Sequence, residues 1–208
     1  MELVKMSVEE FLAELASESP APGGGSVSAL AAANAAALCE MVCNLTLGKE
    51  KYQEVAEEFS RIKSTAAELQ ARLRRSIDLD TEAFNQVMVA FKLPKGTEEE
   101  KAIRSQAIQD AYCQAIDVPF SVVEACVEIL KLIPEIAAKG NQNALSDAGV
   151  AANIALAGME GAILNVRINL PYLKDETLKQ KLYSKLEGLR EEGKTWYKKA
   201  NEIVENKL

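Results

Sequence analysis

The sequence predicts an all-α protein, a bundle of long and partly kinked helices. Three observations predict this class. Apolar residues recur at spacings of three and four along most of the chain, helix-start motifs precede several of these stretches, and no segment shows the alternation of a strand. The 208 residues are 48% hydrophobic, which is enough for one substantial core, so we expect residues 1–208 to form a single domain.

Two helices are expected in the first 47 residues. Ser7-Val8-Glu9-Glu10 is a capping-box pattern and predicts a helix over residues 7–17. The segment 20–26 contains three successive glycines and leads into an alanine-rich stretch, which predicts a second helix over residues 27–47. Because alanine covers most faces of this second helix, we expect it to have close helical neighbours.

A third helix is expected over residues 51–92, where one continuous apolar stripe includes Ile77, Phe84 and Val87. Asp80 lies inside this stripe. A carboxylate there must find a partner or hold a proton more tightly, because stranding its charge costs on the order of several kcal/mol. Two interpretations are open: a buried ion pair with an Arg or Lys of another helix, and a functional carboxylate.

Four further helical segments are expected in the second half of the chain. Thr97-Glu98-Glu99-Glu100 is a second capping box, and its helix is expected to end at Asp117 because Pro119 breaks or kinks the path. Pro134 is expected to kink the apolar segment that follows. A helix over residues 144–169 stops at Leu170-Pro171, and a charged amphipathic helix follows over residues 175–206.

Polar residues are concentrated in the turn of residues 139–150, between two strongly apolar segments. Gly140 is expected to end one helix in the left-handed conformation, and Asn143 or Ser146 to cap the next. Asp147 then falls in a first turn, where it either stabilises the positive end of the helix or takes part in a site. Its face continues as a row of small residues, which either admits a neighbouring helix or leaves room for a ligand: Asn143, Asp147, Ala151, Ile154, Gly158, Gly161, Asn165 and Asn169.

Composition excludes several classes of function. The balance of 31 Asp and Glu against 24 Lys and Arg argues against nucleic acid or an anionic membrane as partner. The uncharged run 20–39 contains two prolines and three glycines, which argues against a membrane span. With no signal peptide, the four cysteines are expected to be reduced core residues of a cytoplasmic protein. The lack of histidine and of a tight cysteine pair argues against bound metal.

Extensive alanine and glycine surfaces on two helices favour a homodimer, although packing within one chain explains them too. Without histidine, acid–base chemistry falls to carboxylates, Lys, Cys or Tyr.

Five separated motifs, taken together and in this order, resemble the cyclodeaminase domain of the formiminotransferase-cyclodeaminase family. They are Pro22-Gly23-Gly24-Gly25-Ser26, Asn44-Leu45-Thr46-Leu47-Gly48-Lys49, Asp80-Thr81-Glu82-Ala83-Phe84, Lys139-Gly140-Asn141-Gln142-Asn143 with Ser146-Asp147, and Asn165-Val166-Arg167-Ile168-Asn169-Leu170. The resemblance covers nearly the whole chain. It implies an all-helical, dimeric enzyme of one-carbon metabolism, with a tetrahydrofolate derivative as substrate and no bound cofactor.

Two reactions follow from the resemblance. Members of the family close 5-formiminotetrahydrofolate to 5,10-methenyltetrahydrofolate with release of ammonia, in histidine degradation, or hydrolyse the methenyl bridge to 10-formyltetrahydrofolate. We expect the first reaction, with the cyclohydrolase reaction as the alternative. A non-catalytic helical protein that binds a folate or a partner is the second alternative.

Both reactions pass through a tetrahedral carbon bonded to two folate nitrogens, next to a cationic group, so the site needs carboxylates that stabilise the cation and exchange protons. On the motifs that carry the resemblance, we expect Asp80 and Asp147 as this pair, one with a raised pKa and the other ionised. Arg167 can instead pair with either of them. The substrate-binding candidates offer amides and a hydroxyl to the pterin, or cations and backbone N–H groups to the glutamate carboxylates: Asn141, Asn143 and Ser146, and Arg167, Lys49, Gly23, Gly24, Gly25 and Ser26.

Overall fold

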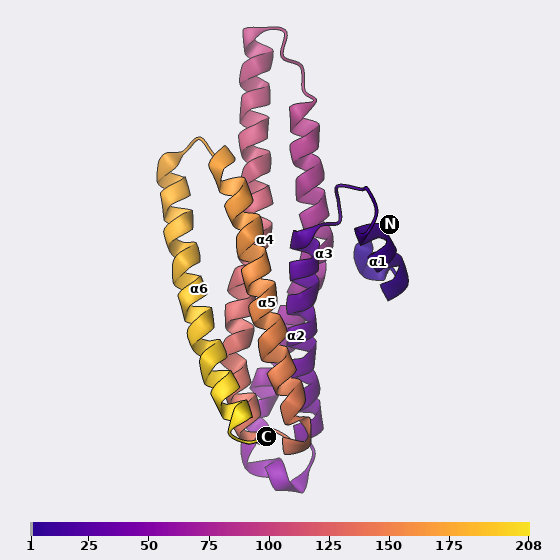
Figure 1. Ribbon diagram of the computed structural model, residues 1–208, viewed down its shortest axis with the longest axis vertical. Helices are drawn as coiled ribbons and strands as arrows, with labels where there is room; N and C mark the ends of the chain where they lie inside the picture. Colours follow the sequence, from indigo (N-terminus) through magenta and orange to yellow (C-terminus); the bar gives the residue numbers. More distant parts are fainter. Residues whose placement is uncertain (1) are drawn as a thin grey trace.

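The long helices form a bundle in the computed structural model, which describes residues 2–208. Helices α2, α3, α4 and α5 pack on one another, and α6 packs against α4 and α5. The hairpin of α3 and α4 extends beyond the ends of the other helices (Figure 1). No strand occurs in the described range, so the prediction of an all-α bundle is confirmed. The bounds of the five helices are Gly24–Thr46, Ala56–Phe91, Glu98–Lys139, Leu145–Asn169 and Glu176–Glu205.

Shorter elements join or precede these helices. The N-terminal segment lies against α3, where Asp78 Oδ1 accepts a hydrogen bond of 2.5 Å from the backbone N–H of Leu3. The helix α1 stands beside the bundle (Figure 1). The short elements are η1 (Leu3–Lys5), α1 (Val8–Leu15), η2 (Glu50–Val55), η3 (Gln142–Ala144) and η4 (Leu170–Tyr172).

Helix starts follow the capping chemistry of the sequence. Both predicted capping boxes are present: the side chains of Ser7 and Thr97 accept the backbone N–H three residues on, and Glu10 and Glu100 reach back to the N–H of each cap. Helix α2 begins three residues earlier than predicted. Gly24 and Gly25 therefore form its first turn rather than a loop before it.

The prediction that the helix starting at Thr97 ends at Asp117 is wrong, because α4 continues through Pro119 and Pro134 to Lys139. A proline removes the N–H that would bond to the carbonyl four residues earlier, which for Pro119 is the carbonyl of Ala115. In this structure the side-chain Nδ2 of Asn169 donates to that carbonyl at 3.2 Å. A neighbouring helix thus replaces the bond that the proline removes.

The capping predicted for the turn before α5 is also wrong. The N-cap position is Ala144, with no side-chain bond, whereas Asn141 caps the short helix η3. Gly140 ends α4 in an extended conformation, with φ −71° and ψ −177°. Its lack of a side chain matters for another reason. A Cβ at this position would lie 2.4 Å from the carbonyl oxygen of Ile136 and 3.2 Å from the ring of Phe59.

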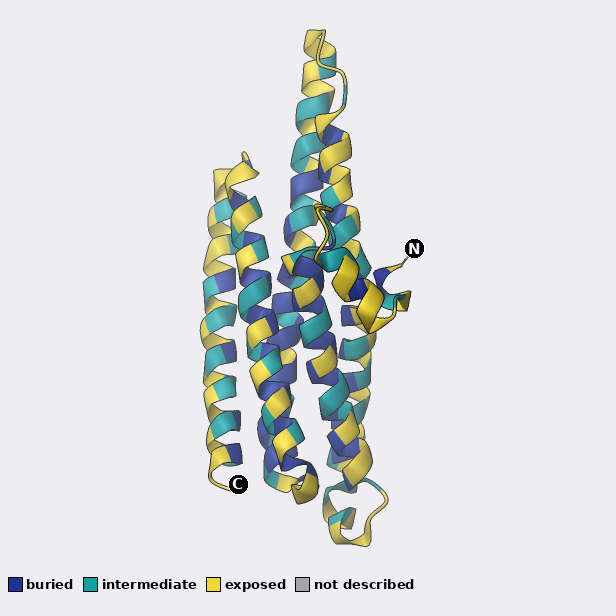
Figure 2. Ribbon diagram, turned by 45° about the vertical axis from the view of Figure 1, so that its right-hand side comes forward, coloured by how far each residue is buried: buried dark blue, intermediate teal, exposed yellow. Residues whose placement is uncertain are grey.

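The core runs along the bundle axis and contains most of the cysteines (Figure 2). Cys39, Cys43 and Cys126 are buried, Cys113 is half-buried, and all four are free thiols. Burial raises the pKa of the Cys43 and Cys126 thiols to about 12. The prediction that all four cysteines are core residues is confirmed for the three that are buried. Burial of this kind makes a thiol inert.

One side of α2 and α5 is apolar and exposed. Because α4 packs against both helices, their exposed faces point away from it. The exposed residues follow each helix at spacings characteristic of a packing stripe, and they are Val27, Met41 and Leu45 on α2 and Val150, Leu164 and Ile168 on α5. Ile168 is 67% exposed. By length and composition α2 and the stretch Gln142–Tyr172 are apolar enough to cross a membrane, a property that core helices share.

Candidate active site

The carboxylate of Asp80 lies against the first turn of α2. The Ser26 hydroxyl is 3.1 Å from its Oδ2 and 2.9 Å from the carbonyl oxygen of Ile77, and it donates to one acceptor at a time. A Cβ on Gly25 would lie only 2.0 Å from Oδ1 of Asp80. Position 25 must therefore be glycine for the carboxylate to occupy this place.

Burial sets the protonation behaviour of Asp80. Loss of solvent raises the pKa of its carboxyl, and hydrogen bonds from Ser26 lower the pKa by less than burial raises it. Within residues 2–208, no cation contributes to this balance. Of the two interpretations of Asp80, the buried ion pair with Arg or Lys is therefore not what the structure contains. The ionised form is stabilised by the hydrogen bonds from Ser26, which lies in the first turn of α2.

Two further polar residues, to which the sequence analysis gave no role, complete what we call the Asp80 cluster. Thr81 Oγ1 is 3.4 Å from the Ser26 hydroxyl, and the Asn165 side-chain amide approaches Gly24 from α5. The cluster thus comprises residues 23–26, Asp80, Thr81 and Asn165. A cavity of about 690 Å³ adjoins it at Thr81, between α3 and the N-terminal segment.

The row of small residues on α5 admits a helix. A Cβ on Gly158 would lie 3.0 Å from the backbone oxygen of Ser28, and one on Gly161 would lie 2.5 Å from the Ser28 hydroxyl. Close packing of α5 on α2 therefore explains these two glycines, and the middle of the row holds no ligand space.

A second group of candidates, the Asp147 cluster, lies at the other end of α2. Asn141 is buried and holds the turn against that end: its backbone N–H donates to Thr46 Oγ1 at 2.9 Å, and its Nδ2 donates to the carbonyl of Leu45 at 3.0 Å. Asp147 lies half-buried in the first turn of α5. The other members are exposed, and they are Lys49, Asn143 and Ser146.

The two clusters are far apart within one chain. Helix α2 is 23 residues long, and at 1.5 Å per residue it spans about 35 Å. The Asp80 cluster is at its first turn and Asn141 is bonded to its last turn. The predicted pair, Asp80 and Asp147, is therefore separated by roughly 30 Å in one copy of the protein.

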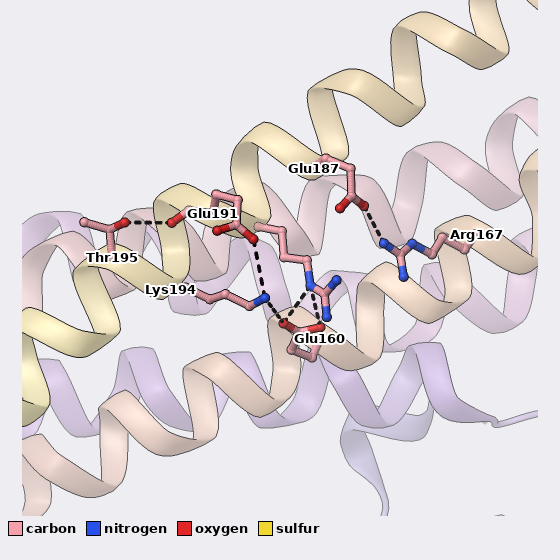
Figure 3. Close-up of polar contacts among 7 residues, drawn as sticks. Glu160, Arg167, Glu187, Glu191, Lys194 and Thr195 are labelled. Carbon is pink, nitrogen blue, oxygen red and sulfur yellow. Dashed lines mark hydrogen bonds and ion pairs between the residues drawn. The ribbon is translucent and has the colours of Figure 1, made fainter.

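The structure brings Arg167 to neither cluster. Its guanidinium pairs with Glu187 of α6, next to an ion pair of 2.9 Å between Arg190 and Glu160 (Figure 3). Side chains two positions apart on a helix point in directions that differ by about 200°. Arg167 therefore points away from the face on which Asn165 meets Gly24. Arg167 joins α5 to α6 and pairs with neither Asp80 nor Asp147.

A helical bundle that holds a carboxylate of raised pKa against a glycine-rich helix start has the features of an acid–base enzyme. Comparison with known proteins makes the class specific. The chain belongs to the formiminotransferase-cyclodeaminase family, whose model matches residues 7–188. The resemblance carried by the five motifs is thereby confirmed.

Named relatives fall into two activities. A methenyltetrahydrofolate cyclohydrolase of Methylorubrum extorquens is 43% identical over 97% of both chains. The formimidoyltransferase-cyclodeaminase of Mus musculus is 36% identical over 93% of this chain, which spans only 36% of that protein. The crystal structure of a formiminotetrahydrofolate cyclodeaminase of Thermotoga maritima has a TM-score of 0.88 at 32% identity, covering 99% and 98% of the two chains. The chain is thus an enzyme of a family whose members are cyclohydrolases and cyclodeaminases.

Proposed function

We propose that the protein hydrolyses 5,10-methenyltetrahydrofolate to 10-formyltetrahydrofolate. One observation carries the choice: the 43% identical relative, matched over 97% of both chains, is named for this reaction. Cyclodeamination of 5-formiminotetrahydrofolate, which the sequence analysis placed first, is the second candidate because of the Thermotoga maritima neighbour. Both reactions use the same carbon between the two folate nitrogens.

The chemistry needs one group that exchanges protons and one that faces a cation. In hydrolysis, the ionised Asp80 accepts a proton from water as the water oxygen bonds to the methenyl carbon. The protonated Asp80 then returns that proton to the departing ring nitrogen, N5, as its bond to this carbon breaks. The hydroxyl proton that remains on the carbon's oxygen leaves to solvent, which gives the neutral 10-formyl group. The carboxylate of Asp147 faces the cation. Burial supports this role for Asp80, because a raised pKa brings a carboxyl closer to neutral pH.

A homodimer supplies both carboxylates to one site. The exposed apolar stripe of α2 and α5 supports a second copy as its partner, since exposed apolar faces of this kind mark interfaces. A twofold axis that crosses the middle of α2 places the two copies of this helix antiparallel. The Asp80 cluster of one protomer then meets the Asp147 cluster of its partner, at both ends of the interface.

Absorbance of the methenyl chromophore tests the reaction. Purified protein should accelerate the loss of absorbance of 5,10-methenyltetrahydrofolate and leave 5-formiminotetrahydrofolate unchanged. A rise in absorbance with the formimino substrate would establish the second candidate instead. If folded protein changes the absorbance with neither substrate, the alternative of a non-catalytic protein that binds a folate or a partner stands.

Mixed dimers test the shared site. Asp80→Asn and Asp147→Asn homodimers should each be inactive. Refolding an equimolar mixture produces half mixed dimers, each with one site that has both carboxylates, so about one quarter of wild-type activity should return. A mixture that forms dimers but stays inactive would overturn the shared site.

A further inference from the structure

The Ser26 hydroxyl lies between two acceptors that belong to α3. Its oxygen is 2.9 Å from the backbone oxygen of Ile77 and 3.1 Å from Oδ2 of Asp80, and Ser26 has no exposed surface. A serine hydroxyl carries one hydrogen and two lone pairs, so it donates to one of these acceptors at a time. A rotation of the hydroxyl hydrogen is therefore enough to change the acceptor, and no heavy atom has to move.

The charge of Asp80 determines which acceptor the hydroxyl uses. An ionised carboxylate is the stronger acceptor, because a charge-assisted hydrogen bond is roughly twice as strong as one between neutral groups. A protonated carboxyl loses this advantage, whereas the backbone carbonyl of Ile77 remains a strong acceptor at the shorter of the two distances. Protonation of Asp80 therefore turns the Ser26 hydroxyl towards Ile77.

The Ile77 carbonyl accepts or releases this hydrogen at little cost. Ile77 lies inside α3, where the regular helical donor to its carbonyl is the backbone N–H of Thr81, four residues on. A carbonyl oxygen has two lone pairs, so the hydroxyl of Ser26 uses the second one. In neither charge state of Asp80 does the buried hydroxyl of Ser26 lack an acceptor.

Charged groups of the neighbouring elements do not set the protonation of Asp80. Within residues 2–208, burial raises the pKa of its carboxyl and hydrogen bonds from Ser26 lower it. Residues 24–38 of α2 include no titratable group, and Arg167 of α5 pairs with Glu187 instead. The acidic groups on the other elements around Asp80, none of which contributes to this balance, are Asp78 and Glu82 of α3, Glu2 and Glu14 of the N-terminal segment and Asp117 of α4.

We propose that Ser26 is a positioning residue whose hydroxyl follows the proton of the reaction, donating to Asp80 while this carboxylate is ionised and to the carbonyl of Ile77 once Asp80 has accepted the proton. The inference rests on the proposed function, in which Asp80 accepts a proton and returns it. The hydrogen of Ser26 only rotates, so the catalytic proton stays on Asp80, and the carboxyl group keeps its place in both steps. This role differs from the contact with glutamate carboxylates that the sequence analysis proposed for Ser26.

The pH dependence of turnover tests the proposal. Ser26→Ala removes the donor that favours the ionised form of Asp80, so the acidic limb of kcat/KM for 5,10-methenyltetrahydrofolate should move up by about one pH unit. Ser76→Ala is the matched control, because it removes another buried hydroxyl, one that donates to the carbonyl of Arg72 within α3. Its limb should stay at the wild-type pH. A rate loss in Ser26→Ala that is equal at every pH, as a hydroxyl bonded equally to both charge states would give, or equal limb shifts in both variants, would overturn the inference.

Carbon-13 NMR of the Asp80 carboxyl separates this inference from the proposed reaction. Protein labelled at the aspartate carboxyl carbons can be titrated without substrate, and Asp80→Asn identifies the Asp80 resonance. The titration midpoint should rise by about one pH unit in Ser26→Ala and stay at the wild-type value in Ser76→Ala. This result without turnover of either folate would keep the exchange of acceptors at Ser26 and reject the reaction. An unchanged midpoint in folded Ser26→Ala would overturn the inference, whatever the turnover.

Discussion

Replacing Gly25 with Ala should inactivate the enzyme without unfolding it. The added methyl carbon would lie 2.0, 2.4 and 2.6 Å from Oδ1, Cγ and Oδ2 of Asp80, where ordinary contact begins at 3.4 Å. The carboxylate must therefore move by about 1.4 Å from its present position. Misplacing a catalytic group by about 1 Å costs on the order of 100-fold in rate, whereas alanine is a better helix former than glycine.

The assay is the loss of methenyl absorbance, together with a thermal melt of each variant. Gly188→Ala is the control, because it adds the same methyl to a helical glycine, in α6, with nothing within 4 Å of the added carbon. We expect its rate to stay within a few-fold of wild type. Wild-type activity in Gly25→Ala, or equal losses in the two folded variants, would refute the reasoning that places Asp80 in the site.

Three further predictions concern stability. Burial raises the pKa of Asp80, so its proton stabilises the fold below about pH 4 and this contribution is lost as pH rises through the folded pKa. Asp80→Asn should therefore raise Tm more at pH 7 than at pH 4, and an equal change at both would contradict this. Asn169→Ala removes the donor to a carbonyl of α4 and should cost about 1 kcal/mol in urea denaturation, but less in a Pro119→Ala background, where the backbone supplies the N–H. Equal costs in both backgrounds would argue against that replacement. Gly140→Ala should lose about 1–3 kcal/mol by overpacking, whereas Gly188→Ala, with open space around it, should lose none.

Local patterns predicted most of the helices. The capping boxes at Ser7 and Thr97 determine helix starts through bonds within four residues, so they can be read from a short segment. Pro119 could not be interpreted in this way. Whether a proline ends a helix depends on a donor for the freed carbonyl, and that donor, Asn169, lies on another helix.

Only part of the candidate site could be predicted, because contacts between different helices leave no local pattern in the sequence. The apolar stripe of α3 identified Asp80 as unusual, but its partner Ser26 comes from a helix whose position no local pattern gives. Asp147 was predicted from the sequence motif around it. A motif gives no distance, so it could not show that the length of α2 separates Asp147 from Asp80.

The bond from Asn169 to the carbonyl of Ala115 connects the motions of two parts of the molecule. Above Pro119, α4 belongs to the projecting hairpin, and below it to the bundle. While the end of α5 is in place, the hairpin and bundle share one rigid axis. If that end frays, the carbonyl loses its donor and α4 gains a hinge at Pro119. Amide hydrogen exchange in the hairpin should therefore follow the opening of the α5 terminus, so that order in the hairpin depends on a contact made one turn beyond the start of α2.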